Sequence, residues 1–444
     1  MNSNQQQDKR LISLFTAISI VVANMIGTGV FTSLGFQAAE IKSGFALLCL
    51  WVVGGIFALC GALSYSELGA AMPRSGGEFH YLSKIYHPAI GFLSGWVSVT
   101  VGFAAPIAAA AMALGQYLSK VSPIFNPLLV ASLTVIGVSI VHTSDRKLGS
   151  YFQNVFTVLK VLLIVFLVVS GLFIAQPQDI NFLPAPGDMN VILSSPFAIS
   201  LVFVMYSYSG WNASTYIASE VAEPEKNVPR SLIAGTLIVL VLYLLINFTF
   251  LYTAPIDELA GQLEVGYISA TRIFGVSGGK IMSLLISFGL ISSISSMIWA
   301  GPRVTQVIGE DIPFFKVLAS KNKNGVPYYA ILLQLAIVLV LVITSSFETV
   351  LTYLGFTLTL SSFITVLGVF VHRLRYPDAP RPYKTWGYPV TPLIFLGISA
   401  WMLIYILLDK PQESLAGLMT IFVGLLVYFF VSKNKRLVSS GSKN

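Results

Sequence analysis

The amino-acid sequence predicts an all-α membrane protein with twelve transmembrane helices, two of which are interrupted near the middle of the membrane. Hydrophobic residues make up 55% of the 444-residue chain and charged residues 10%, which is too little polar surface for a water-soluble globule. Apolar runs of spanning length recur twelve times, and glycine and polar residues break the first run and the sixth. We therefore expect one transmembrane domain over residues 1–444 and no soluble domain.

The twelve runs are bounded by proline, glycine or charged residues. They cover residues 11–39, 44–71, 88–118, 124–142, 151–174, 191–219, 230–253, 280–301, 327–345, 349–371, 391–408 and 414–432. The first run follows a polar start and has full spanning length without a small-residue cleavage site. We expect it to remain as the first helix rather than to be removed as a signal peptide.

The basic residues predict the orientation in the membrane. With twelve helices both ends of the chain lie on one side. If that side is the cytoplasm, 20 of the 26 Lys and Arg residues are cytoplasmic and five are external: Lys42, Lys120, Arg272, Lys280 and Lys410. Cytoplasmic loops carry such an excess, so we expect a multi-pass protein of the cell membrane with cytoplasmic termini. The same bias explains the net charge of +7 without a nucleic-acid partner.

Titratable residues leave little chemistry inside the predicted spans. All eight Asp residues fall outside them, and the four His residues fall near cytoplasmic helix ends, where we expect them to be solvated. This pattern disfavours an intramembrane protease, a metal transporter and a carboxylate proton pathway. We expect no enzyme activity, metal or cofactor, since no nucleophile and base pair is visible. Glu67 and Glu220 lie beside basic loops, and we expect them to form structural ion pairs.

The first run is broken by Gly27, Thr28 and Gly29. The residues from 11 to 26 would reach only about 24 Å as a helix, which is short of a hydrocarbon core of roughly 30 Å. The span must therefore continue through the glycines. An opened turn here exposes backbone N–H and C=O groups that lipid cannot satisfy and a bound solute can. Taken alone, the two glycines also fit a close-packing site between helices.

The sixth run is interrupted at a similar depth by residues 206–212, where tyrosine, serine, glycine and asparagine replace aliphatic residues. Taken alone, this segment also fits an aromatic packing patch. Paired broken spans in the two halves of a chain indicate inverted repeats around a midplane site, as in the leucine-transporter-type fold. We expect a 5+5 arrangement, with one repeat over about 11–174, a second over about 191–371, and two appended helices over about 391–432.

Two opened helices suit a zwitterionic ligand. Free N–H groups at the start of a half-helix, at the positive end of its dipole, attract a carboxylate. Free carbonyls at the end of the preceding half-helix accept hydrogen bonds from an ammonium group. The pattern therefore predicts a site for a small molecule that carries both charges, with an apolar wall from Tyr206, Tyr208 and Trp211.

With these motifs in order, the chain resembles the amino acid, polyamine and organocation transporter superfamily, close to its L-type amino acid transporter branch. Residues 27–31 are similar to the helix-one signature of that superfamily, a Gly-Ser/Thr-Gly followed by an aliphatic residue and Phe. Residues 65–68 with 73–78 resemble the motif that joins helices two and three. Residues 210–212, Glu220 and residues 224–230 resemble helix six and its exit loop.

The resemblance implies roles for the residues at the two interruptions. Thr28 and Gly29, following Gly27, would offer N–H groups to a substrate carboxylate. The ammonium group would meet the carbonyls of three residues: Met25, Tyr206 and Ser209. Tyr206 would be the gate, although many relatives have Phe at this place. Beyond Gly210, Asn212 would flank the pocket for the side chain of the substrate, and Ser207 and Ser209 would make the site more polar.

Lys160 lies ten residues into the fifth run, about 13 Å from its end, which is deep for a lysine that reaches back to the interface. An ammonium at that depth needs carbonyl or hydroxyl partners, and the serines of helix eight, which are mostly packing residues, include one or two within its reach. The resemblance implies that Lys160 stands in for a sodium ion between helices one and eight, as in sodium-independent members. A snorkelling lysine is the alternative.

The sequence thus predicts a sodium-independent secondary transporter that moves L-amino acids, neutral ones foremost, by alternating access as an exchanger or facilitator. A proton-coupled amino acid symporter is one alternative. An amine or polyamine permease is another, although it would favour a buried acid, and none lies in the predicted spans. A channel or a nutrient-sensing receptor is an alternative from another class of protein. Counter-substrate inside a vesicle would accelerate uptake by an exchanger and not by these. The sequence leaves open whether an accessory subunit is required.

Overall fold

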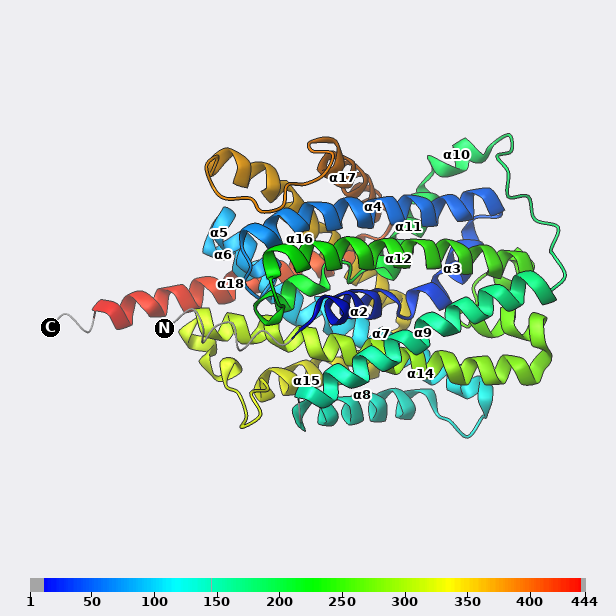
Figure 1. Ribbon diagram of the computed structural model, residues 1–444, viewed down its shortest axis with the longest axis horizontal. Coiled ribbons are helices and arrows are strands. Elements are labelled where there is room, and N and C mark those ends of the chain that lie inside the picture. Colours follow the sequence, from blue (N-terminus) through cyan, green and yellow to red (C-terminus); the bar gives the residue numbers. More distant parts are fainter. Residues whose placement is uncertain (1–11, 145, 441–444) are drawn as a thin grey trace.

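The computed structural model describes residues 12–144 and 146–440, which form a bundle of helices that run mostly along one direction (Figure 1). In this part of the chain, nine helices are long and apolar enough to cross a membrane. Two shorter apolar helices, α8 (Pro127–Ser144) and α15 (Tyr328–Thr344), run beside them. The chain is therefore an all-helical, multi-pass membrane protein.

The remaining elements follow in chain order. They are α2 (Leu14–Met25), α3 (Gly29–Glu40), α4 (Gly44–Ala71), α5 (Glu78–Ile85), α6 (Pro88–Val97), the π-helical turn η1 (Ser98–Gly102), α7 (Ala104–Val121), α9 (Arg146–Ile174), α10 (Asp188–Ile192), α11 (Ser195–Tyr208), the 3₁₀ helix η2 (Ala213–Glu220), α12 (Pro224–Thr253), α13 (Ile256–Leu259), α14 (Val265–Asp311), the 3₁₀ helix η3 (Pro313–Ala319), α16 (Phe347–Arg375), α17 (Val390–Asp409) and α18 (Pro411–Ser440).

The predicted run 280–301 is part of a much longer helix. α14 has 47 residues, and Gly275 inside it has a φ of 75° and a ψ of 179°, so that two helical segments meet at a kink. Glycine adopts this backbone conformation without the steric cost that other residues bear. Arg272, the glycines between 275 and 279 and Lys280 break the apolar run, which is why the sequence places the start of the helix too late.

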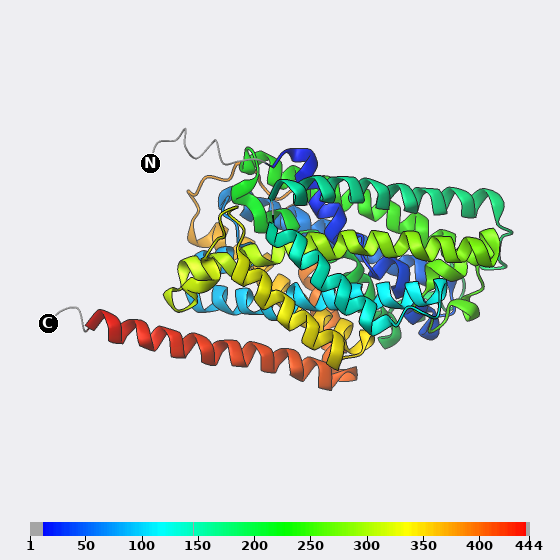
Figure 2. The same cartoon turned by 90° about the horizontal axis from the view of Figure 1, so that it is seen from below.

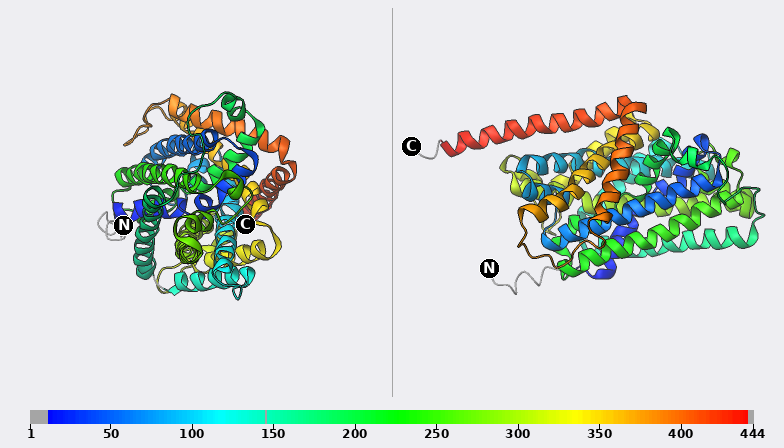
Figure 3. Two further views of the ribbon diagram at one scale, coloured as in Figure 1. Left: turned by 90° about the vertical axis from the view of Figure 1, so that its right-hand side faces the viewer. Right: turned by 90° about the horizontal axis from the view of Figure 1, so that it is seen from above.

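The two interrupted segments lie inside the bundle, and the last two helices lie outside it. α2 packs against α9, α12 and α14, while α3 packs against α11, α12 and α14. Figure 2 shows α18 along one side of the molecule, and the end-on view in Figure 3 places α17 and α18 at its periphery. α18 extends beyond the bundle at the end from which α2 starts (Figure 1). The centre of the molecule is thus built from the helices that carry the interruptions.

Small and aromatic side chains fill the core. α7 presents buried alanines, among them Ala104, Ala105 and Ala108, to the helices around it, and α14 is a close neighbour. Small residues let helix backbones approach closely where lipid provides no hydrophobic driving force. Near the interruptions, the ring of Trp51 meets Tyr243 edge to face, with ring centroids 5.5 Å apart. Such packing holds α4 and α12 together beside the interrupted helices.

The outer surface is rich in exposed large apolar side chains. A water-soluble protein rarely exposes a contiguous apolar surface of this extent, whereas lipid-facing helices require one. The surface spans helices from both halves of the chain, which fits a bundle surrounded by lipid. Examples are Leu162, Phe166, Val241, Leu245, Phe422 and Leu426.

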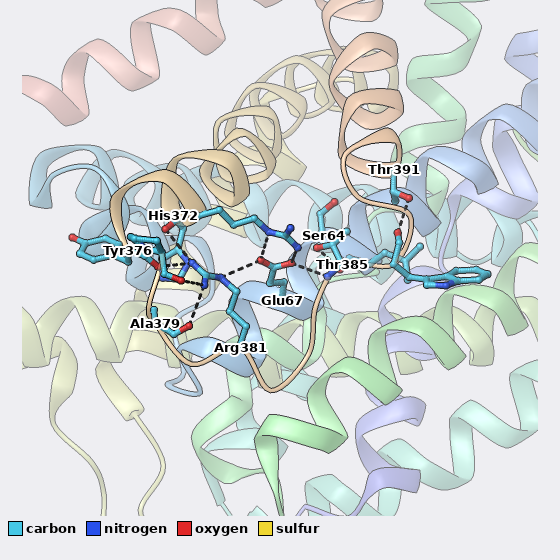
Figure 4. Close-up of polar contacts among 12 residues, drawn as sticks. Ser64, Glu67, His372, Tyr376, Ala379, Arg381, Thr385 and Thr391 are labelled. Carbon is cyan, nitrogen blue, oxygen red and sulfur yellow. Dashed lines mark hydrogen bonds and ion pairs between the residues drawn. The ribbon is translucent and has the colours of Figure 1, made fainter.

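A buried ion pair ties the segment after α16 to α4. Two nitrogens of the Arg373 guanidinium donate to the Glu67 carboxylate at 2.8 and 2.6 Å, and the backbone N–H of Thr385 donates to it at 2.7 Å. Arg381 lies 3.7 Å from the same carboxylate. Figure 4 shows how the loop between α16 and α17 folds around Glu67. The expected structural ion pair at Glu67 is present.

The second expected ion pair is present as well, because Nε of Arg303 donates to Glu220 at 2.9 Å. The prediction of solvated histidines is wrong for three of the four. The exposed fractions of His80, His142 and His372 are 7%, 8% and 6%. His80 lies on the short helix α5, His372 packs against Tyr376 just after α16, and His142 bonds to Ser295 and meets the ring of Trp299 on α14.

Candidate binding site at two interrupted helices

The first interruption lies between Met25, where α2 ends, and Gly29, where α3 begins. Ile26 closes α2 with a φ of −71° and a ψ of 88°, which is outside the helical region. The last carbonyls of a helix and the first N–H groups of the next have no partner within their own helix. Both kinds of group therefore face each other across residues 26–28 in the middle of the bundle.

The second interruption follows α11. Ser209 ends the helix with a ψ of 146°, and Gly210 has a φ of 98°. This left-handed conformation favours glycine over any residue with a Cβ atom. From Ala213 the chain continues as the 3₁₀ helix η2, so the direction and the winding of the sixth segment both change at Gly210.

The two interruptions cross in direct contact. A Cβ atom on Gly29 would lie 2.3 Å from Oγ and 2.5 Å from Cα of Ser207. A Cβ atom on Gly210 would lie 2.9 Å from the carbonyl carbon of Asn24 and 3.0 Å from its oxygen. Each interruption thus supplies one glycine whose missing side chain lets the other segment approach its backbone closely.

Side-chain hydrogen bonds join the same two segments. The hydroxyl groups of Thr28 and Tyr206 are hydrogen-bonded to each other. Ser33 bonds to the Ser207 hydroxyl at 2.9 Å and donates to the carbonyl of Phe203 at 3.2 Å. A buried hydroxyl requires a partner, and here each interrupted helix provides the partners of the other.

Tyr243 on α12 reaches both interruptions with one hydroxyl group. Its oxygen lies 2.5 Å from the carbonyl oxygen of Met25 and 2.9 Å from that of Ser207. The ring is fully buried. Tyr243 therefore compensates carbonyl groups that the two helix ends leave open.

Lys160 on α9 compensates the other carbonyls of α2. Its ammonium donates to the carbonyls of Ile26 at 2.5 Å and Ala23 at 3.3 Å, and to the Ser293 hydroxyl at 2.8 Å. Ser293 in turn donates to Ile26 at 2.8 Å. Lys160 is 2% exposed, so a snorkelling lysine does not describe it. The ammonium joins α9, α14 and the end of α2 through neutral oxygens.

A pocket lies beside the crossing, bordered by α2, α4, the start of α5, η1 with the start of α7, α11 to η2, α14 and α16. Its wall near the interruption is polar, with backbone and hydroxyl groups, and the wall from α7, α14 and α16 is mostly apolar. Such a combination of an apolar cavity and a few polar groups is typical of small-molecule sites. The lining includes Asn24, Phe57, Glu78, Ser98, Phe103, Met205, Trp211, Tyr216, Met297, Leu354, Leu358 and Thr359.

Four of the residues predicted for the site line this pocket: Tyr206, Ser209, Gly210 and Asn212. The other predicted residues lie at the crossing and are not among the lining residues. They are Met25, Gly27, Thr28, Gly29 and Ser207. Tyr206 connects the two groups, because it lines the pocket and bonds to Thr28. Its side chain therefore stands between the pocket and the first turn of α3.

The third span contributes lining residues that sequence reasoning did not identify. The π-helical turn η1 ends at Gly102, which lines the pocket together with Pro106. Proline has no N–H, so the bond from residue 106 to the carbonyl of Gly102 cannot form. π-helical turns are frequent at functional sites. Proline four residues after glycine within an apolar run is the signal that could have found this turn.

Glu78 also lines the pocket, and the sequence did not identify it as a site residue because residues 72–87 have the composition of a connection between spans. The carboxylate is 4% exposed and accepts hydrogen bonds from Tyr65 at 2.9 Å, Asn212 at 2.9 Å and Tyr216 at 2.7 Å. Burial raises the pKa of Glu78 above its ordinary value, and the three donors act in the opposite direction. A carboxylic acid that lies outside the predicted spans thus borders the pocket.

Comparison with known proteins adds independent information. Residues 12–436 match the family described as amino acid permease. The chain is 26% identical to the serine/threonine exchanger SteT of Bacillus subtilis (strain 168) over 98% of this chain and 100% of that protein. It is 28% identical to the mouse large neutral amino acids transporter small subunit 2, over 95% of this chain and 81% of that protein. Mouse b(0,+)-type amino acid transporter 1 is also 28% identical, over 94% and 87%.

The glycine contact at the crossing yields a test of the geometry. Gly29→Ala should lower the thermal stability of the purified protein in detergent, because the methyl group meets the backbone of Ser207 and overpacking costs roughly 1–3 kcal/mol. Gly27→Ala is the matched control, since its Cβ atom would have its nearest contact at 3.6 Å. Melting temperatures of the two variants decide the matter. Equal stability of both would contradict the close contact.

Proposed function

The chain belongs to the amino acid permease family, and from this premise we propose that it is a sodium-independent secondary transporter of L-amino acids, chiefly neutral ones. It works by alternating access as an exchanger or facilitator. The observation that carries the proposal is the crossing of two interrupted helices at the wall of a buried pocket. The names of the serine/threonine exchanger and of the large neutral amino acids transporter subunit support the substrate class.

Both charged ends of an amino acid find partners at the crossing. The first turn of α3 offers N–H groups from Thr28 and Gly29 at the positive end of a helix dipole, which suits the carboxylate. The carbonyls of Met25, Tyr206 and Ser209 suit the ammonium. In this structure Tyr206 lies over the first turn of α3, so we propose that the ring moves when substrate binds and acts as the gate.

We propose the leucine-transporter-type fold, with twelve spans in a 5+5 inverted repeat, as the framework for this site. Nine long helices, two shorter apolar helices and the interrupted pair α11 and η2 together provide twelve crossings. The interruptions fall in the first and sixth of these crossings, which are corresponding places in two sets of five. Alternating access then consists of one set of helices rocking against the other around a fixed site.

Lys160 supports independence from sodium. Its ammonium, on α9, is bonded to the end of α2 and to α14 through three neutral oxygens. A sodium ion about 4 Å away would be repelled by roughly 4 kcal/mol at an effective dielectric of 20, or about a thousandfold in affinity. The fixed ammonium makes the cation contacts that a bound sodium ion would otherwise make.

An amine or polyamine permease is the second candidate, and Glu78 is the observation that favours it. A substrate without a carboxylate would leave the N–H groups of α3 without an anionic partner, whereas the buried carboxylate at the pocket could receive an ammonium group. A panel of radiolabelled amino acids and diamines separates the two candidates. An accessory subunit, as the name of the large neutral amino acids transporter small subunit 2 suggests for that protein, is compatible with either.

Transport should be an exchange that does not require sodium. In proteoliposomes, internal amino acid should accelerate uptake of the labelled amino acid, and replacing sodium by choline should leave the rate unchanged. Lys160→Ala should nearly abolish transport, because the carbonyls at the end of α2 lose their cation. Lys280→Ala, at an exposed lysine of α14, is the control and should transport normally. A strict sodium requirement would contradict the role of Lys160, and uptake indifferent to internal substrate would favour a facilitator or a channel over an exchanger.

Tyr206 should act through its ring. Tyr206→Ala should weaken the apparent affinity for substrate by about tenfold, since an aromatic face over the site is lost. Tyr206→Phe loses only the hydrogen bond to Thr28 and should retain most transport. The measurement is the concentration dependence of uptake for both variants. If Phe and Ala variants lose affinity equally, the hydroxyl rather than the ring is the important group.

Both termini should face the cytoplasm of the cell. In a chain with Cys49 and Cys60 replaced by serine, a single cysteine at Gln262 should react with an impermeant thiol reagent added to intact cells. Cysteines at Ser3 and Ser442 should react only after permeabilisation. The reason is the excess of basic residues on the side of the termini. Labelling of Ser3 in intact cells, with none at Gln262, would reverse the orientation.

A further inference from the structure

Glu78 is a buried carboxylate to which the proposed binding mode assigns no contact with the carboxylate or the ammonium of an amino acid. It starts α5 and borders the pocket at the cytoplasmic side of the crossing in the proposed orientation. In the part of the chain that the structure describes, the buried carboxylates of Glu67 and Glu264 form ion pairs with basic residues, whereas Glu78 forms none. Asp188, the other buried carboxylate without an ion pair there, accepts a hydrogen bond from the backbone of Ala185 in the loop before α10 and does not line the pocket. A buried carboxylate without a cation is costly in its charged form.

The surroundings of Glu78 are neutral on every side that packs against it. α4 contributes Tyr65, α5 contributes Tyr81, and η2 contributes Asn212 and Tyr216. α16 adds the hydroxyl groups of Ser362 and Thr365 beside Tyr65, and α7 adds the ring of Phe103 against Tyr216. Tyrosines keep their protons at neutral pH. The charge on Glu78 is therefore stabilised by neutral donors alone.

His80, two residues further along, is the titratable side chain nearest in sequence. It faces Arg74, Lys84 and Asp311 rather than the pocket. Burial, together with the charges of Arg74 and Lys84, lowers the pKa of His80 to about 4. His80 is therefore neutral across the physiological range and provides a natural control.

We propose that Glu78 is a proton-binding site, and that its protonation from the cytoplasm releases the contacts that close the cytoplasmic end of the substrate pocket. This inference rests on the proposed function. In this reaction one O–H bond of a hydronium ion in the cytoplasmic water breaks, one O–H bond forms on a carboxylate oxygen, and a water molecule is left. Substrate exchange then depends on internal pH.

The structural consequence of the proton follows from the three hydrogen bonds. The charged carboxylate holds Tyr65 of α4 and Asn212 and Tyr216 of η2 at one point, and hydrogen bonds to a charged acceptor are about twice as strong as neutral ones. The protonated acid becomes a donor on one oxygen and a weaker acceptor on the other. η2 is then held less firmly against α4, and the amide of Asn212 becomes free to contact a substrate.

The sign of the pH effect is defined. Burial raises the pKa of Glu78, so the proton binds at a higher pH than it would on an exposed glutamate. The closed arrangement is favoured while Glu78 is charged, and it is lost as internal pH falls through that raised pKa. Exchange should therefore accelerate, by about tenfold, when the lumen of right-side-out proteoliposomes is titrated from alkaline to acidic pH through that raised pKa.

Glu78→Gln tests the proposal, because glutamine has nearly the same shape and cannot bind the proton. Exchange by this variant should be independent of internal pH and as fast as exchange by the acidified wild-type protein. Tyr216→Phe removes one donor to the carboxylate, so its pH response should remain and shift to higher pH. His80→Gln should keep the wild-type profile. An unchanged pH profile in Glu78→Gln would overturn the proposal, and so would the loss of the profile in His80→Gln.

A second measurement does not depend on transport. Infrared titration of the purified protein should show the C=O band of a protonated carboxylic acid that appears in the wild-type protein on acidification and is missing in Glu78→Gln. If Glu78→Gln does not fold, Tyr216→Phe still tests the proposal, because the band should then appear at a higher pH than in the wild-type protein. Absence of amino acid transport at every pH would contradict the proposed function, whereas transport without this band would contradict the inference about Glu78 alone.

Discussion

The central constraint on this molecule is that peptide groups released by an interrupted helix must find partners in the middle of a membrane. Lipid offers none, and each unsatisfied group costs several kcal/mol. Here the carbonyls at the end of α2 receive hydrogen bonds from Lys160, Ser293 and Tyr243, which come from α9, α14 and α12. Three long helices are thereby fixed around the interruption. The positions of these helices in the bundle follow from the need to place their donors within hydrogen-bond distance of the carbonyls of α2.

Some of the site could be predicted because it obeys local rules. A glycine pair at half the depth of an apolar run indicates an interruption, and a lysine at the depth of Lys160 must find oxygen partners whatever the fold. The serine that Lys160 reaches in the predicted eighth helix, which is part of α14, is Ser293. The ion pairs of Glu67 and Glu220 were also predictable, since basic loops lie beside both helix ends.

The rest depends on packing that no local rule contains. The rotation of α7, α14 and α16 decides which of their side chains face the pocket, and several rotations bury an equally apolar surface. The path of residues 72–87 decides that Glu78 turns inward. The polar composition of this segment instead indicates a connection exposed to solvent. The start of α14 before the kink at Gly275 was hidden by polar residues. In each case the missing information is the position of a neighbouring helix.

Tyr243 has one hydrogen to give and two acceptors within reach, the carbonyls of Met25 and Ser207. A hydroxyl group donates a single hydrogen bond, so at any instant one of these oxygens is served and the other is not. An ammonium group carries three hydrogens. The ammonium of a substrate held as proposed would therefore offer one of them to the carbonyl that Tyr243 does not serve at that moment, so that substrate and tyrosine would share the two acceptors between the two halves of the molecule.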